Sequence, residues 1–149
     1  MIYLLDTNIV LAYLRQHPLC EFIDQQYAAL APENYPVVSV VTWAELESLA
    51  RQNNWGFRRI NEIQQFLSRF LLADINRREI VLRYAEIDAF SQGKLHGQPL
   101  QGSARNMGKN DIWIAATASV LGATLLTTDK DFDHLHDNYL PVVRLDPHR

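Results

Sequence analysis

The sequence has few of the features that mark secreted or membrane-bound chains. Cys20 is the single cysteine in 149 residues, which excludes a disulfide framework and agrees with a reducing cytoplasm. No basic segment precedes Ile2, and the first apolar run is interrupted at Asp6, so we expect neither a signal peptide nor a membrane span. The formal net charge is -3, so binding to nucleic acid would need local basic patches or bound cations.

The composition is that of an ordinary globular protein rather than a disordered or fibrous one. Hydrophobic residues make up 48% of the chain and charged residues 21%. A chain of this length buries enough surface to fold without disulfides or structural metals. We find no internal repeat and no change of composition that would mark a second domain. We therefore expect residues 1–149 to form a single domain in the cytoplasm.

The pattern of apolar residues predicts an alternation of strands and helices. Residues 2–5 are apolar and are followed by Asp6, Thr7 and Asn8, which is typical of a buried strand of a parallel sheet. Further strands are predicted at 36–41, 71–75, 123–127 and 141–145. Helical spacing predicts helices at about 9–14, 19–30, 42–53, 57–71, 77–90 and 110–121, the first of them capped by Thr7 or Asn8. Such alternation predicts an α/β fold, a three-layer α/β/α sandwich with a mostly parallel central sheet.

Residues 93–109 differ in character from the rest of the chain. This segment is rich in glycine and contains three basic residues, Lys94, Arg105 and Lys109. It is predicted to be a loop. A loop of this length in a compact domain is usually functional or mobile.

Four acidic residues occur where predicted strands end or predicted helices begin. Asp6 ends the first strand and Asp129 follows the fourth, whereas Glu45 lies in the first turn after the second strand and Asp111 opens a helix. In a parallel sheet these positions share one edge, and ligands of open α/β sheets bind at that edge. We therefore expect the four carboxylates to converge. Glu47 is about 200° around the helix from Glu45, so only one of the two faces the cluster.

Four converging carboxylates would need a cation or protons. Two unit charges about 5 Å apart repel by roughly 3 kcal/mol at an effective dielectric of about 20. Oxygen ligands without histidine or cysteine favour Mg²⁺ or Mn²⁺ over zinc. A metal held in this way keeps positions open for water and phosphate oxygens, which is the chemistry of phosphodiester hydrolysis.

Each acid also has a simpler interpretation when it is taken alone. Asp6 can cap the following helix, and Asp111 can be an ordinary acid of a first helical turn. Thr42 as N-cap with Glu45 after it fits the capping-box pattern. Near Asp129, Asp131 either caps a short helix that begins at 132 or shares the acidic edge. The joint placement of the acids on one edge favours the cluster.

Two further pairs of residues leave alternatives open. His134 and His136 are near each other, but without a cysteine or a third histidine the pattern favours a solvated turn over a metal pair. Trp55 and Phe57 flank a glycine near a helix junction. They belong either to the core or to an exposed groove for a partner's helix or strand.

Four segments spread over nearly the whole chain are LLDTNIVLAYL, VVSVVTWAELESLA, NDIWIAATA and LLTTDKDF, in that order. They resemble the motifs of the PIN domain, specifically of the VapC-type toxin ribonucleases of bacterial type II toxin–antitoxin systems. The resemblance implies a PIN-like fold and a Mg²⁺- or Mn²⁺-dependent endoribonuclease that acts on RNA. It also implies a homodimer and a small antitoxin protein that covers the active-site groove.

The resemblance assigns roles to seven residues of this chain. Metal binding and catalysis would fall to the acids Asp6, Glu45, Asp111 and Asp129. Ligands or water would be oriented by the polar neighbours Asn8, Asn110 and Thr127. The sequence departs from many relatives at Thr128, where they carry a larger or charged residue, and in the glycine-rich segment 93–109.

The main alternative is a catalytically inactive PIN-like interaction domain, but no acid of the set is missing from this chain. A haloacid-dehalogenase-like phosphatase would carry a second aspartate where this chain has Asn8. A phosphoacceptor receiver domain would need paired acids near the first strand and a late lysine after a strand, and neither is evident.

Overall fold

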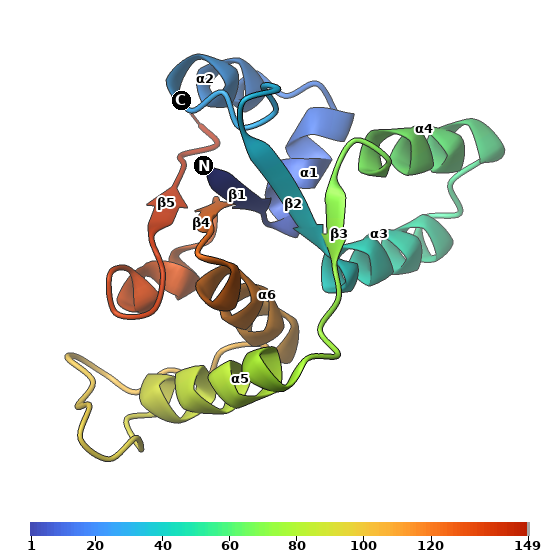
Figure 1. Ribbon diagram of the computed structural model, residues 1–149. Coiled ribbons are helices and arrows are strands. Elements are labelled where there is room, and N and C mark those ends of the chain that lie inside the picture. The colour runs from blue at the N-terminus through green and yellow to red at the C-terminus, as the bar shows by residue number, and fades with distance from the viewer. Residues whose placement is uncertain (149) are drawn as a thin grey trace.

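The computed structural model describes residues 1–148, and its centre is a five-stranded sheet in the order β3-β2-β1-β4-β5 (Figure 1). The strands are β1 (Ile2–Leu5), β2 (Tyr35–Ser39), β3 (Leu71–Ala73), β4 (Thr124–Thr127) and β5 (Val142–Arg144). All four neighbouring pairs of these strands are parallel. The predicted α/β fold is thus confirmed, with a sheet that is wholly parallel within the described strands.

Helices cover both faces of this sheet (Figure 1). They are α1 (Thr7–Leu14), α2 (Leu19–Gln26), α3 (Val40–Gln52), α4 (Phe57–Leu67), α5 (Arg78–Ser91) and α6 (Lys109–Leu121), with a 3-10 helix, η1 (Lys130–Leu135), before β5. Helices α5 and α6 pack together on one side of the sheet, and α1, α2 and α4 supply the core on the other. None of the helices within residues 1–148 is long and apolar enough to cross a membrane.

The central strands are apolar throughout because both of their faces are buried. Leu4 of β1 and Leu125 of β4 belong to the core that includes α5, α6 and η1. The next residues along the same strands, Leu5 and Leu126, belong to the core that includes α1, α2 and α4. All four side chains are fully buried, and burial of such a side chain contributes about 1.5–3 kcal/mol. Successive side chains of a strand point to opposite faces, so an unbroken apolar run fits a sheet covered on both sides.

The strand order places a crevice at the carboxyl ends of β1 and β4. From β1 the chain moves outward to β2 and β3, and it then returns to the other side of β1 to form β4 and β5. In open α/β sheets, ligands bind where the strand order reverses in this way. The residues directly after β1 and β4 therefore lie at the position that a functional site occupies in this class of fold.

Several predicted boundaries are displaced, and for two of them the structure shows the reason. The helix predicted at 19–30 ends at Gln26, because Ala28 adopts a left-handed backbone conformation with φ 49°. The strand predicted at 36–41 ends at Ser39, whose hydroxyl accepts a hydrogen bond from the backbone N–H of Val41 at 3.0 Å. Ser39 thereby caps α3, and two β-branched residues that favour a strand locally become the first turn of a helix. The other predicted elements are present with displaced ends.

Trp55 and Phe57 have different environments. Trp55 is partly buried against the core on the α1, α2 and α4 side, and the Arg59 guanidinium lies 4.4 Å from its ring centroid. Phe57, the first residue of α4, is 85% exposed. Trp55 therefore belongs to the core. Phe57 does not, and a groove for a partner at this position stays a prediction.

Candidate active site

Asp6 is held in a fixed orientation at the end of β1. Its Oδ1 accepts a hydrogen bond from the backbone N–H of Thr7 at 2.8 Å, and its Oδ2 accepts one from the Thr127 hydroxyl at 2.7 Å. The side chain is buried, with 4% of its surface exposed. Asp6 is itself the N-cap of α1, so the prediction that Thr7 or Asn8 caps this helix is wrong. The helix begins two residues earlier than the apolar spacing indicated.

Glu45 points to the same region from α3. The Thr7 hydroxyl donates a hydrogen bond to Glu45 Oε1 at 2.7 Å and lies 3.0 Å from the Thr42 hydroxyl. Because Ser39 caps α3, Glu45 lies in the second turn of the helix rather than the first, and the capping-box interpretation is wrong. Glu47 instead forms an ion pair with the arginine one turn further along α3, at 3.0 Å. One of the two glutamates faces the cluster, as predicted.

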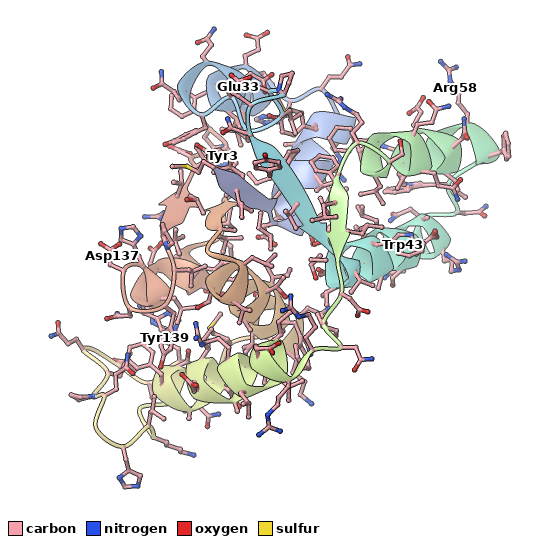
Figure 2. All side chains as sticks on the ribbon, in the orientation of Figure 1. Tyr3, Glu33, Trp43, Arg58, Asp137 and Tyr139 are labelled. Atoms are coloured by element: carbon pink, nitrogen blue, oxygen red, sulfur yellow. The ribbon has the colours of Figure 1, made fainter. Side chains whose placement is uncertain are left out.

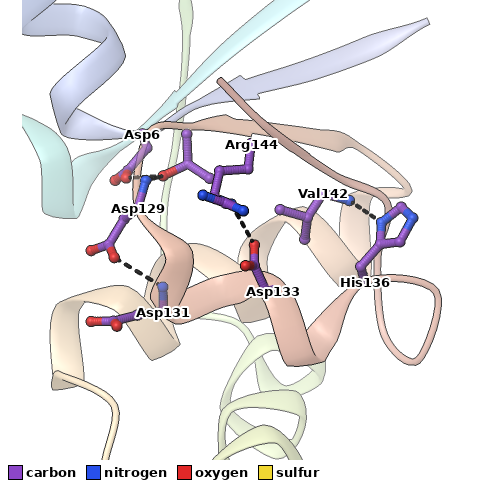
Figure 3. Close-up of polar contacts among 8 residues, drawn as sticks. Asp6, Asp129, Asp131, Asp133, His136, Val142 and Arg144 are labelled. Atoms are coloured by element: carbon purple, nitrogen blue, oxygen red, sulfur yellow. Dashed lines mark hydrogen bonds and ion pairs between the residues drawn. The ribbon is translucent and has the colours of Figure 1, made fainter. Parts of the chain in front are cut away.

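Asp111 and Asp129 approach from α6 and from the end of β4. Asp111 lies in the first turn of α6, which begins one residue before the predicted 110 and has Gly108 as its N-cap. Asp129 caps η1 by accepting a hydrogen bond from the backbone N–H of Asp131 at 2.9 Å, so the prediction that Asp131 caps this helix is wrong. Carboxylate oxygens of Asp111, Asp129 and Asp131 all lie within 4.8 Å of one another. In Figure 3 the carboxylates of Asp129 and Asp131 point to the same side of η1.

The four predicted acids line one cavity of about 660 Å³. Asn8 and Asn110 also border this cavity. Thr127 is fully buried beneath it, where its hydroxyl donates to Asp6 and accepts a hydrogen bond from the backbone N–H of Asp129 at 3.0 Å. The remaining lining residues are Thr7, Leu11, Val41, Ala44, Ser48, Leu49, Gln52, Ile75 and Trp113. The expected convergence of the acids is therefore found, with all seven predicted residues in or directly under one cavity.

The acids affect one another electrostatically. Burial raises the pKa of Asp6 to about 6, against the opposing hydrogen bonds from Thr127 and Thr7. The pKa of Asp111 is raised to about 7. Burial is the largest cause, and the negative charges of the neighbouring acids add to it, in the order Asp6, Asp129, Glu45 and Asp131. Within residues 1–148 no lysine, arginine or histidine forms an ion pair with any of these five acids. No ion pair within the described residues compensates their charge.

Comparison with known proteins identifies the family. The PIN domain family matches residues 3–138. Ribonuclease VapC1 of Haemophilus influenzae is 30% identical over 138 residues, which cover 92% of this chain and 94% of that protein. The chain belongs to the PIN-domain family, among the VapC ribonuclease toxins. The resemblance of the four sequence motifs to those of the PIN domain is thereby confirmed.

Solved structures of VapC-type complexes share this fold. The structure of VapBC-1 from nontypeable Haemophilus influenzae has a chain that superposes with a TM-score of 0.73 at 30% identity, over 97% of this chain and 98% of that one. A chain of VapBC2 from Rickettsia felis, bound to a DNA fragment from its promoter, superposes with a TM-score of 0.75 at 24% identity. That alignment covers 98% of this chain and 100% of that one, and it shows likeness of fold.

The carboxylate cluster of this VapC-type chain fits a divalent metal ion. PIN nucleases use a metal, and hard cations such as Mg²⁺ and Mn²⁺ take oxygen ligands. Asp111, Asp129 and Asp131 supply such oxygens close together, and Asp6 and Glu45 border the same cavity. A bound cation would also remove the repulsion that contributes to the raised pKa of Asp111.

The sequence analysis left Asp131 outside the predicted set of acids, and it considered Thr7 and Thr42 only as helix caps. Asp131 brings a third oxygen group near Asp111 and Asp129, and the Asp-Lys-Asp spacing, which suits an Asx turn, was the signal for it. The signal for Thr7 was its position next to Asp6, but its bond to Glu45 joins residues 38 positions apart. Local patterns do not show such a contact.

His134 of η1 and His136, which directly follows η1, have contacts away from the acids. His134 Nε2 lies 2.7 Å from the Ser91 hydroxyl, its ring stacks on Phe90, and burial lowers its pKa. The solvated-turn interpretation is therefore wrong for His134, which ties η1 to α5. His136 is exposed, and its Nδ1 accepts a hydrogen bond from the backbone N–H of Val142 at 2.9 Å. Neither histidine joins the group of possible metal ligands found within residues 1–148.

Replacement of Thr127 by valine is expected to lower the free energy of unfolding by about 1–3 kcal/mol at pH 7. The reason is that Asp6 Oδ2 and the backbone N–H of Asp129 both lose the Thr127 hydroxyl as their hydrogen-bond partner. Urea unfolding measures this change. Thr124→Val on the same strand is the matched control, since no side-chain hydrogen bond of Thr124 occurs in the described chain. Equal urea midpoints for the two variants would show that the Thr127 hydroxyl does not support Asp6.

Proposed function

We propose that this chain is a Mg²⁺- or Mn²⁺-dependent endoribonuclease, the toxin of a type II toxin–antitoxin module, which hydrolyses RNA phosphodiester bonds at Asp6, Glu45, Asp111 and Asp129. The observation that carries the proposal is the meeting of these carboxylates, from four separate segments, in one cavity without a compensating cation from residues 1–148. Carboxylates without counter-charges are expensive to hold together unless they bind a metal.

Asp6, Glu45, Asp111 and Asp129 would hold the metal, and Asp131 is the additional candidate ligand. When bound, a divalent ion polarises a phosphoryl oxygen and lowers the pKa of water at the site. The α6 N-terminus further favours negative charge at Asp111, by about 0.3–1 kcal/mol.

The polar residues of the chain orient the acids and bind the substrate. Thr7 and Thr127 each donate to a different oxygen of Asp6, which prevents rotation of its carboxylate. The Thr7 hydroxyl also fixes Glu45 Oε1, so one residue couples the two acids. The exposed amides of Asn8 and Asn110 border the cavity, where they are suited to donate hydrogen bonds to phosphate oxygens or to orient water.

The proposal extends to partners and location. The solved relatives include a toxin–antitoxin complex from Klebsiella pneumoniae and several VapBC structures, which supports a small antitoxin protein as partner of this chain. A homodimer is proposed on the family resemblance, and the exposed side chains of Phe57 and Leu71 offer apolar surface for a protein contact. An RNA substrate places the proposed site of action in the cytoplasm.

Removal of divalent metal is expected to abolish RNA cleavage, and Mg²⁺ or Mn²⁺ is expected to restore it, because the acids cannot bind a phosphate without a cation between them. The measurement is gel analysis of a labelled single-stranded RNA incubated with purified protein in EDTA and then with each metal added in excess. Undiminished cleavage in EDTA would contradict the metal requirement. Absence of cleavage with every metal would instead favour the inactive interaction domain.

A further inference from the structure

The acidic cavity contains an apolar wall that metal binding does not require. Its lining includes Leu11, Leu49, Ile75 and Trp113 beside the carboxylates. A divalent ion and a phosphate group bind to oxygen ligands and hydrogen-bond donors, not to apolar surface. An apolar wall next to such a centre fits the uncharged part of a nucleotide, which is its base. Trp113 is the one aromatic side chain among the described residues that line this cavity.

Trp113 and Asp111 both lie near the start of α6, and both line the cavity. They are two positions apart on α6, about 200° around the helix axis and about 3 Å along it. Both nevertheless line the cavity, because the cavity lies over the N-terminal end of α6. A phosphate bound near Asp111 would therefore have an aromatic ring close to its neighbouring base.

The Trp113 ring is positioned before any ligand binds. The ring of Tyr84 on α5 packs against it, with 4.3 Å between the centroids and an angle of 39° between the planes. Trp113 is partly buried against the α5 and α6 core, and its indole N–H has no hydrogen-bond acceptor in the described part of the chain. An aromatic ring that is already ordered loses little conformational entropy when a base stacks on it.

We propose that Trp113 is the stacking platform for a nucleobase of the RNA strand whose phosphate lies at the acids, a subsite that rests on the proposed ribonuclease function. Every base has a π-face, so stacking contributes affinity with little sequence preference. Bases in a duplex are already stacked and paired, so this subsite selects single-stranded RNA. Trp113 is then a binding residue, and the carboxylates act on the adjacent phosphodiester bond.

Substitution of Trp113 tests the proposal by steady-state kinetics with Mn²⁺ and single-stranded RNA. Trp113→Leu is expected to raise KM about 10-fold, within the range for loss of one stacked base, whereas Trp113→Phe keeps a ring and raises it less. The matched control is Trp43→Leu, since Trp43 is 43% exposed on α3 and does not line the cavity (Figure 2). An unchanged KM for Trp113→Leu overturns the proposal.

An RNA series with one abasic position at a time separates stacking from a merely structural role. For the unmodified protein, one abasic position near the cleaved bond is expected to raise KM about 10-fold. In Trp113→Leu that same position has no further effect, because the stacking partner is already absent. Additive losses at every position would show that Trp113 only supports the fold, and would overturn the subsite.

A fluorescence measurement keeps the test valid if Trp113→Leu does not fold. The chain has three tryptophans, so the double variant Trp43→Phe and Trp55→Phe leaves Trp113 as the single indole. Addition of single-stranded RNA is expected to quench its emission, whereas duplex RNA of equal length leaves it unchanged. Lack of quenching by an RNA that the protein cleaves overturns the subsite alone. Lack of cleavage by the unmodified protein with any metal overturns the proposed function itself.

Discussion

Asp111→Asn is expected to lower RNA cleavage by at least about 10³-fold while the fold is retained. Asparagine keeps the size of the side chain but removes the charge that a divalent ion requires. No hydrogen bond of the Asp111 carboxylate is found in the described chain, so the substitution breaks no buried contact. It also removes a carboxylate whose pKa is raised to about 7 by burial and by its acidic neighbours. Cleavage of labelled RNA with Mn²⁺ measures the effect, and circular dichroism monitors the fold.

Asp137→Asn is the matched control for this experiment. Asp137 lies between η1 and β5, away from the cavity, with its side chain 80% exposed (Figure 2). Its φ of 61° is left-handed, a conformation that asparagine also tolerates, so the control adds no backbone strain. Cleavage by Asp111→Asn at the rate of this control would remove Asp111 from the proposed site.

The metal-free protein is expected to lose stability as the pH rises from about 4 to about 7. The folded pKa of Asp6 is about 6 against an ordinary value of 3.8, so the folded state binds more protons than the unfolded chain within this window. The free energy of unfolding therefore falls as Asp6 ionises, by about 3 kcal/mol once the pH exceeds its folded pKa. Asp111 acts in the same direction up to a pH of about 7. Thermal unfolding in EDTA at several pH values measures this loss.

Asp6→Asn isolates the contribution of Asp6. At pH 7.5 in EDTA this variant is expected to melt roughly 6–12 °C above the unmodified protein, because it has no buried charge to accommodate. Addition of Mn²⁺ is expected to stabilise the unmodified protein and to change the variant much less. A melting temperature of Asp6→Asn equal to or below that of the unmodified protein in EDTA would contradict an uncompensated charge at Asp6.

The sequence was sufficient to predict the sheet and the meeting of the acids. Leu4 and Leu5 lie in an unbroken apolar run, and only a sheet covered on both faces buries both of them. Parallel strands share one carboxyl edge, so the positions of Asp6 and Asp129 after β1 and β4 were enough to place them together. The prediction depended on topology and did not require exact element boundaries.

The details of the helix starts could not be predicted in the same way. Val41 favours a strand by its local preference, yet the Ser39 hydroxyl begins α3 before it. The hydrogen bond between Thr127 and Asp6 spans 121 positions, and the bond between Thr7 and Glu45 spans 38. The local sequence around each of these residues does not indicate which distant residue it will bond to. The position of Trp113 beside the acids likewise depends on how the end of α6 meets the cavity.

The sheet order has a consequence for synthesis on the ribosome. β1 is made first, but one of its two neighbours, β4, begins only at Thr124, and the contact between them is among the most non-local in the molecule. A nascent chain that ends before that strand has Asp6 without Thr127, and it has neither Asp129 nor Asp131. Non-local pairing of this kind forms late and slowly. A nascent chain is therefore expected to lack the complete proposed site until β4 and η1 have been made.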